Sequence, residues 1–306
     1  MTIDASTAPD GRKDHLDAFA VAALLACCVL WGLNQVAAKV ALADIPPLTQ
    51  AAARSLGAAL LVLAWSRWRG IALWARDATL RGGLAAGALF AAEFACIFVG
   101  LQFTSASRMV VFIYLAPFVV ALGMRFVAGG EHLRPAQWLG LAIAFAGVAW
   151  AFGEAFAHDA AGGPRQWLGD TLGVAAALFW AATTLAIRAT ALAKAPAEKT
   201  LLYQLAVSAA LLALGAYGAD ESWPAKVSAI ALSALAFQTI VVTFASYLVW
   251  FWLVRHYPAT RLAAFTLLTP VAGLAAGVGL LGEPLTMRLG VAVVAVAFGI
   301  ALVSRR

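Results

Sequence analysis

The stretch ASRMVVFIYLAP at residues 106–117 returns as ATRLAAFTLLTP at residues 259–270. The two copies share Ala, Ser or Thr, Arg, Phe, Leu and Pro at a constant offset of 153 residues, so the chain contains an internal duplication. In each copy a polar connection carrying an arginine leads into an apolar segment. A proline, Pro117 or Pro270, follows ten residues after the Ser or Thr.

These two prolines predict a kink within each apolar segment. A proline inside a helix donates no backbone hydrogen bond and clashes with the carbonyl four residues earlier, here that of Ile113 or Thr266. Hydrocarbon cannot satisfy the freed carbonyl, so the kinked backbone is expected to face other helices or a wet cavity. A packing kink without a ligand role explains either proline alone, but its recurrence favours the cavity. Pro117 and Pro270 are therefore the predicted hinges.

Composition places the whole chain in a membrane. Of its 306 residues, 63% are hydrophobic and 12% are charged, against about 25% charged in a soluble domain. One crossing of a bilayer takes about 20 apolar residues. Ten such runs cover residues 18–41, 47–66, 79–100, 104–127, 135–153, 167–188, 200–217, 227–254, 259–281 and 285–303. We expect no cleaved signal peptide, because polar residues precede the first run.

The distribution of lysine and arginine predicts the orientation. With a cytoplasmic N-terminus, the inner segments hold fifteen of the 21 basic residues and the outer segments hold five, which leaves Arg54 inside a helix. Positive charge gathers on the cytoplasmic side of membrane proteins, so both termini are predicted to be cytoplasmic. The net charge of +6 is scattered over many short loops and does not indicate a nucleic-acid partner.

The duplication and the number of crossings together predict inverted repeats around a central cavity. Each half holds five predicted helices, an odd number, so the second half must enter the membrane upside down; such repeats are typical of alternating-access transporters. The predicted fold is an all-α membrane protein with ten transmembrane helices as two inverted five-helix repeats. The predicted divisions are a cytoplasmic tail at 1–17, a first repeat at 18–153, an outer linker at 154–166, a second repeat at 167–303 and a cytoplasmic C-terminus at 304–306.

The order of the motifs resembles a known family. Trp31 and Gly32 are followed seven residues later by Lys39, the fourth and ninth runs contain proline, and Gly-Glu precedes the fifth and tenth runs. Over about residues 18–303 the chain is similar to EamA-type exporters of the drug/metabolite transporter superfamily, including bacterial aromatic amino acid exporters. The resemblance implies export of amino acids or other small metabolites across a bacterial inner membrane. Ala181 replaces Gly32 in the second copy and no arginine answers Arg54, which argues against a strictly pseudo-symmetric site.

Glu93 and Arg54 are the charged candidates inside the membrane. A charge at the bilayer centre costs about 2.5 to 3.5 kcal/mol on the insertion scale, so each calls for a partner or a function. Both lie about seven residues from the outer ends of consecutive predicted helices, which makes a pair feasible. Three interpretations stay open: a structural ion pair, substrate contact with Glu93 facing an ammonium or Arg54 a carboxylate, and proton coupling through Glu93.

Polar and aromatic side chains complete the predicted site. Trp31, Gln35 and Lys39 are spaced by four and share a helix face, as do their counterparts Trp180, Thr184 and Arg188 at an offset of 149 residues. An amide facing lipid without a partner is costly, so we place these faces toward the cavity. Packing explains any single residue equally well. The predicted substrate-binding set is Trp31, Gln35, Arg54, Glu93, Tyr114, Trp180, Thr184, Tyr203, Gln238, Thr243, Ser246, Tyr247 and Trp250.

The function predicted from these features is secondary-active or facilitative export of amino acids by alternating access, over a range that includes aromatic and other neutral ones. The alternative is an exporter of other small metabolites or drugs. No Gly-rich loop with Lys-Ser/Thr indicates direct use of ATP. Proton coupling and facilitated movement both stay open.

A membrane-embedded enzyme is the competing class, and the sequence argues against it. All four histidines, His15, His132, His158 and His256, fall in the tail or in connections, and no Gly-x-Ser-x-Gly motif occurs. The chain is predicted to need no cofactor or metal. Its predicted partners are a small-molecule substrate and the lipid bilayer.

Glycines spaced for close helix contact bear on the oligomeric state. Gly83 and Gly87 have the four-residue spacing that lets two helices approach closely. Such a pair marks either a dimer face or packing inside the bundle, and the bundle is the favoured interpretation. A monomer or a weak dimer is predicted.

Overall fold

The computed structural model describes residues 15–75, 77–104, 106–127, 133–151, 153, 163–272 and 287–304. In this part of the chain the regular structure is helical, and six helices are long and apolar enough to cross a membrane. Four shorter apolar helices lie at Val111–Phe126, Pro135–Trp150, Ala259–Ala272 and Gly290–Val303. The ten helices correspond to the ten predicted runs. The prediction of an all-α membrane protein is thereby confirmed.

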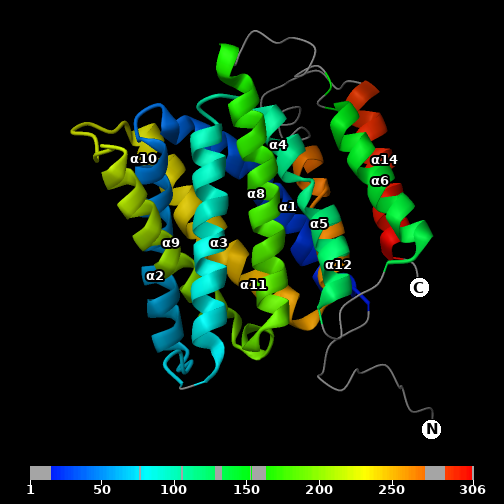
Figure 1. The fold of residues 1–306 in the computed structure, drawn as a ribbon, viewed down its shortest axis with the longest axis horizontal. Helices are drawn as coiled ribbons and strands as arrows, with labels where there is room; N and C mark the ends of the chain where they lie inside the picture. The colour runs from blue at the N-terminus through cyan, green and yellow to red at the C-terminus, as the bar shows by residue number, and fades with distance from the viewer. Residues whose placement is uncertain are drawn as a thin grey trace.

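The helices follow one another through short connections (Figure 1). In the first half they are α1 (Ala18–Leu42), α2 (Pro47–Trp68), α3 (Thr79–Gly100), α4 (Ala106–Ile113), α5 (Ala116–Gly123), η1 (Met124–Phe126) and α6 (Pro135–Ala151). In the second half they are η2 (Gly163–Arg165), α8 (Gln166–Ala189), η3 (Ala191–Lys194), α9 (Ala197–Gly218), α10 (Ala229–Ala236), the π-helical η4 (Phe237–Ser246), α11 (Tyr247–His256), α12 (Ala259–Phe265) and α14 (Met287–Ser304).

Local chemistry explains how several helices start and stop. The side chain of Asp17 caps α1 by accepting a hydrogen bond from the backbone N of Ala20 at 2.9 Å. Helices α2 and α9 each have 22 residues, and each follows a proline cap, Pro46 or Pro196. Each also ends beside a residue with positive φ, Gly70 at 65° and Asp220 at 54°. The two helices are thus copies in their local structure as well as in their position along the chain.

The two repeated prolines lie just after interruptions of the helix. Helix α4 ends at Ile113 and α5 begins at Ala116, directly before Pro117. Helix α12 ends at Phe265, and helical backbone resumes at residue 268, before Pro270. The kinks predicted from the sequence are present, because a proline cannot complete the hydrogen bond to the carbonyl four residues back. Their role as hinges stays a prediction.

The helices of the two halves pack against each other in a pattern with internal symmetry. Helix α2 packs on α9 and α6 on α14, each pairing the same position of the two halves, and α5, the second part of the fourth span, packs on α12, the first part of the ninth. Helix α3, the third span of the first half, packs on α8, the first span of the second half. The converse contact is also present, because α1, the first span of the first half, packs on α10, η4 and α11, which form the third span of the second half. Figure 1 shows α6 and α14 side by side at one edge of the molecule. The two repeats are therefore interleaved rather than separate.

Small residues permit the closest contacts between helices. A Cβ atom on Gly299 of α14 would lie 2.3 Å from the carbonyl oxygen of Gly140 on α6. A Cβ atom on Gly83 would lie 2.4 Å from the ring of Tyr203, so this glycine serves the contact between α3 and α9. Gly83 thus packs inside the bundle, as favoured from the sequence. Exposed leucines, valines and phenylalanines cover the outer faces of the helices, as lipid contact requires.

Candidate functional site

A cavity lies between the two halves of the bundle. Its volume is about 90 Å³, against roughly 10–15 Å³ for one water by the same measure, so it has room for several waters or a small solute. Residues of α1, α3, α4, α8, α9 and α11 line it, so both repeats contribute to its wall. The lining residues that matter below are Trp31, Asn34, Phe90, Glu93, Phe94, Phe98, Tyr114, Trp180, Thr183, Thr184, Gln204, Tyr247 and Trp250.

The structure brings seven of the sequence-predicted residues together in this wall. They are Trp31, Glu93, Tyr114, Trp180, Thr184, Tyr247 and Trp250. Five of them are aromatic, and rings from separate parts of the chain meet edge to face. The ring centroids of Trp31 and Trp250 are 5.3 Å apart, and those of Tyr114 and Trp180 are 5.7 Å apart. Edge-to-face pairs of this kind fix the positions of the rings and give the cavity rigid apolar walls.

Five predicted residues lie outside the cavity wall: Arg54, Tyr203, Gln238, Thr243 and Ser246. The Tyr203 hydroxyl is instead 3.4 Å from the Thr79 hydroxyl oxygen, beside the contact with Gly83. Thr243 is buried. The side chain of Gln35 lies outside the described residues, although the backbone of α1 is described there.

Two of these five residues, Ser246 and Gln238, support the cavity from behind. Ser246, the last residue of the π-helical η4, accepts a hydrogen bond from the indole N–H of Trp31 at 2.8 Å and donates to the carbonyl of Val242 at 2.6 Å. Gln238 accepts from the side-chain amide of Gln50 and donates to the carbonyl of Ala37, both at 3.3 Å. Ser246 thereby sets the orientation of an indole ring that lines the cavity, and Gln238 ties η4 to α1 and α2.

Arg54 is fully buried behind the cavity wall. Its guanidinium carbon lies 3.8 Å from the centroid of the Phe94 ring and 5.4 Å from that of Phe98. Its three side-chain nitrogens have no hydrogen-bond partner among the described residues. Arg54 and Glu93 act on each other electrostatically. Within the described part of the chain, no ion pair closer than 4.0 Å joins the two groups. The direct pair considered from the sequence is therefore replaced by cation–π stacking and a longer-range attraction.

Sequence reasoning missed Asn34 and gave weight to Tyr203 over its neighbour Gln204. Both Asn34 and Gln204 line the cavity, and each has a buried side-chain oxygen without a hydrogen-bond partner in the described structure. A signal for Gln204 was present in the sequence. At the offset of 150 residues that superposes the Pro46 and Pro196 caps, Gln204 is the counterpart of Arg54. Asn34 lies three residues after Trp31 and so shares its helix face.

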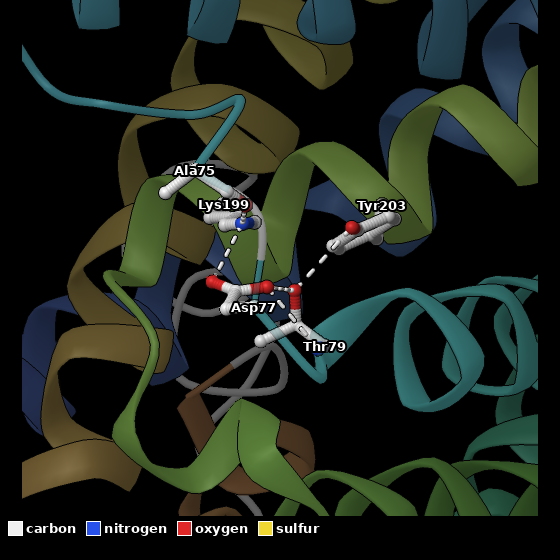
Figure 2. A network of polar contacts seen from close by, with 5 residues as sticks. All are labelled: Ala75, Asp77, Thr79, Lys199 and Tyr203. Carbon is white, nitrogen blue, oxygen red and sulfur yellow. Dashed lines mark hydrogen bonds and ion pairs between the residues drawn. The ribbon is translucent and has the colours of Figure 1, made fainter.

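A polar network joins the two halves at one end of the α2–α9 pair. Figure 2 shows Lys199, in the first turn of α9, reaching the connection between α2 and α3. Its ammonium group lies 2.8 Å from the Asp77 carboxylate and donates to the carbonyl of Ala75 at 3.1 Å. The Thr79 hydroxyl also donates to Asp77. The hydrogen bond from Lys199 lowers the pKa of Asp77 to about 2, and the bond from Thr79 acts in the same direction.

A second network occupies the opposite end of the same helix pair. Glu221, just after α9, accepts hydrogen bonds from the backbone N of Thr49 at 2.8 Å and from its hydroxyl at 3.2 Å. Thr49 is the counterpart of Lys199 at the offset of 150 residues. Asp44 accepts from the backbone N of Ser228 at 2.8 Å, and the side chain of Ser228, followed by this backbone bond, lowers the pKa of the Asp44 carboxyl. Because the end of α9 meets the start of α2 and the reverse also holds, α2 and α9 run antiparallel.

Arg108, the first of the two repeated arginines, takes part in a second symmetry-related pair of contacts between the halves. Asp170 of α8 accepts from Arg108 at 2.5 Å and from the hydroxyl of Thr104 at 2.8 Å. At the offset of 153 residues, Asp17 corresponds to Asp170 and Tyr257 to Thr104, and the Tyr257 hydroxyl donates to Asp17 at 2.9 Å. Each contact joins the first half to the second, so polar contacts between the halves flank the cavity in symmetry-related pairs.

Comparison with known proteins adds a family and a fold. The sequence model of the EamA-like transporter family matches residues 18–153 and 167–305. The chain is 27% identical over 283 residues to the uncharacterized transporter YvbV of Bacillus subtilis, covering 91% of this chain and 89% of that one. It is 28% identical over 284 residues to a probable amino-acid metabolite efflux pump of Escherichia coli, with coverage of 90% and 89%. A solved crystal structure at 21% identity has the same fold, with a TM-score of 0.78 over 94% of this chain and 96% of the other.

Proposed function

The chain belongs to the EamA-like transporter family, and from that premise we propose that it exports amino acids across a bacterial inner membrane by alternating access. Membership makes it a multi-pass membrane transporter rather than an enzyme. The amino-acid substrate and the outward direction are supported by the printed name of the Escherichia coli relative, a probable amino-acid metabolite efflux pump.

Inverted repeats are the architectural part of the proposal. The family matches the chain twice, and the antiparallel course of α2 and α9, which occupy the same position in the two halves, supports opposite insertion. We take residues 18–153 and 167–303 as the two repeats, 154–166 as an outer linker, and 1–17 and 304–306 as cytoplasmic ends. Two repeats related in this way can exchange conformations, which converts an outward-open state into an inward-open one.

The observation that carries the proposal is the cavity between the halves, flanked by polar contacts at both ends. Transport requires that one set of contacts opens while the other stays closed. Asp77–Lys199 and Glu221–Thr49 form one symmetry-related set, at opposite ends of the α2–α9 pair. The interruptions before Pro117 and Pro270 directly follow α4 and α12, the helices that bear the repeated arginines, and we propose a hinge at each interruption.

The substrate site is proposed to be the cavity wall itself. The aromatic rings of Trp31, Trp180 and Trp250 suit an apolar body, and Glu93 supplies charge. Tyr114, Thr184 and Tyr247 complete the predicted contacts in the wall. Arg54 is proposed to balance the charge of Glu93 from behind Phe94. The remaining predicted residues, Gln35, Tyr203, Gln238, Thr243 and Ser246, are proposed to support the wall.

Counterflow in sealed liposomes tests this function. Purified protein should exchange internal amino acid for labelled external amino acid without chemical change, whereas a modified product would contradict transport. Glu93→Gln should reduce counterflow at least about tenfold while the protein stays folded at the assay temperature, because a charged group in the cavity is lost. Glu198→Gln removes a carboxylate outside the cavity wall and should leave counterflow unchanged. Unchanged counterflow in Glu93→Gln would remove Glu93 from the mechanism, and drugs or other metabolites that replace amino acids in the exchange would favour the alternative substrate class.

A further inference from the structure

Two amide oxygens in the cavity region lack the hydrogen-bond donors that buried oxygens normally have. Gln204 is fully buried, and its side-chain nitrogen donates to the carbonyl of Thr200 at 3.3 Å. That carbonyl can only accept, so the orientation of the amide is fixed and Oε1 is left without a partner. Buried acceptors without donors are rare in native structures and call for an explanation.

Asn34 presents the same feature from another helix. Its side chain is 8% exposed, it lines the cavity from α1, and its Oδ1 has no partner in the described structure. Three donors of the wall are already used: Trp31 donates to Ser246, and the hydroxyls of Thr183 and Thr184 donate to carbonyls of their own helix at 2.9 and 3.2 Å. An occupant of the cavity that carries N–H groups can supply the donors missing at both amides.

Glu93 adds a third and stronger acceptor to the same wall. It lines the cavity from α3, and the lining rings of Trp31, Trp180 and Trp250 present π faces and edges around the same space. Aromatic faces attract cations, and a carboxylate gives the strongest hydrogen bonds to a charged donor. A primary ammonium group has three N–H donors and no acceptor. It matches one carboxylate and two amide oxygens on α1, α3 and α9.

Among the described residues that line the cavity, none carries a positive charge that could bind a carboxylate. Arg54 is a buried cation behind the wall, but it is 0% exposed and does not line the cavity. Its guanidinium carbon lies 3.8 Å over the ring of Phe94, which itself forms part of the wall. A carboxylate entering the cavity would meet acceptor oxygens before it could meet Arg54.

We propose that the transporter recognises its substrate by a primary ammonium group, held by Glu93, Gln204 and Asn34, and that a substrate carboxylate is not required for binding. This inference rests on the proposed function for the identity of the site. Amines that carry an apolar body and lack a carboxylate are therefore ligands of the same cavity, and deaminated acids are not.

Three probes of matched shape test the proposal on the purified full-length protein in detergent. They are phenylalanine, 2-phenylethylamine without the carboxylate, and 3-phenylpropionate without the amine. Isothermal titration should show binding of both amines and at least about tenfold weaker binding of the acid, because the acid places a carboxylate against Glu93 and two amide oxygens. Equal or tighter binding of 3-phenylpropionate would overturn the proposal.

Two variants separate the ammonium site from general packing. Gln204→Leu and Asn34→Leu each remove one acceptor at similar volume and should weaken 2-phenylethylamine about ten- to a hundredfold, as expected for a hydrogen bond to a charged group. Ser208→Ala removes a buried hydroxyl one turn along α9, outside the cavity wall, and should leave the affinity unchanged. Unchanged affinity in either leucine variant would overturn the role of that amide. A variant counts as folded when it elutes from a size-exclusion column as a single monodisperse peak.

Different experimental results would overturn the ammonium site and the proposed transport function. Amine binding that depends on Gln204 and Asn34, without any counterflow in liposomes, would overturn transport and leave the ammonium site. Counterflow that proceeds unchanged in both leucine variants would overturn the ammonium site and leave transport.

Discussion

At the scale of single residues, the buried charges Arg54 and Glu93 decide how the cavity is stabilised. The charge of Arg54 is met by the Phe94 ring, by the hydroxyl of Tyr247 and, at longer range, by Glu93. Removing one charge of a buried pair leaves the other uncompensated, and that costs more than the attraction itself contributes. The two side chains should therefore depend on each other although they do not touch.

A double-mutant cycle measures this dependence. Arg54→Met and Glu93→Gln should each lower the midpoint of thermal unfolding, and the double variant should lose less than the sum, with a coupling energy of roughly 0.5 to 3 kcal/mol. Thermal unfolding of the purified protein in one detergent provides the measurement. As a control, the exposed Arg255→Met should combine additively with Glu93→Gln. Additive losses in the Arg54 cycle would contradict the electrostatic coupling.

At the scale of elements, the connection between α2 and α3 is held to the start of α9 by one exposed carboxylate and one buried ammonium. Asp77 is exposed, whereas the Lys199 side chain is 4% exposed and donates to both Asp77 and the carbonyl of Ala75. A buried ammonium needs these acceptors, so the connection is fixed where α9 begins. The same arrangement at the other end, between Glu221 and Thr49, needs no buried charge, because a backbone N–H and a hydroxyl supply the donors.

The low pKa of Asp77 predicts how stability depends on pH at this contact. Its pKa falls from 3.8 to about 2 in the folded protein, so the contact stabilises the fold fully above about pH 5. That contribution should be lost as the pH falls from about 4 to about 1, because the carboxylate is half protonated in the folded protein near pH 2 and protonated in both states only below that. The difference in unfolding midpoint between the wild type and Asp77→Asn should follow this course, being constant above about pH 5, falling steadily below about pH 4 and largely lost near pH 2.

Lys199→Met provides the matched control for the pH measurement. Without the ammonium group, Asp77 loses the first of the interactions that lower its pKa, so adding Asp77→Asn to Lys199→Met should change the unfolding midpoint far less. A difference between wild type and Asp77→Asn that stays constant down to pH 2 would contradict the proposed ion pair.

At the scale of the whole molecule, the antiparallel course of α2 and α9 links topology to mechanism. Residues that follow α2 and residues that precede α9 meet at one end, while residues that precede α2 and follow α9 meet at the other. The distribution of basic residues predicts which end is cytoplasmic. This prediction makes the end that contains Asp77 and Lys199 the inner one and the end that contains Thr49 and Glu221 the outer one.

Cysteine labelling in intact cells checks this orientation. Single cysteines at the exposed positions Ser222 and Lys226 should react with a membrane-impermeant maleimide, and cysteines at the exposed positions Ala78 and Lys194 should react only after the membrane is opened. The background should lack Cys27, Cys28 and Cys96, of which the first two are buried and the third is half-buried. The reverse pattern, or labelling of both sets from outside, would contradict the inverted topology.

The sequence by itself determined the crossings, the duplication and the two kinks, because these depend on local chemistry: runs of about 20 apolar residues, an odd number of them in each half, and a proline that cannot complete a helix. It also singled out seven residues of the cavity wall, because aromatic and polar side chains at helical spacing share one face.

Only the tertiary structure decided which residue of each helix meets the cavity. Neighbouring positions on a helix point about 100° apart, so Tyr203 packs on Gly83 while Gln204 lines the cavity. In a membrane the lipid and the helix interfaces are both apolar, so hydropathy does not separate a side chain that faces lipid from one that faces a partner helix. The position of Arg54 behind Phe94, the unpartnered oxygens of Asn34 and Gln204, and the partners of Asp77 and Glu221 all depend on that packing.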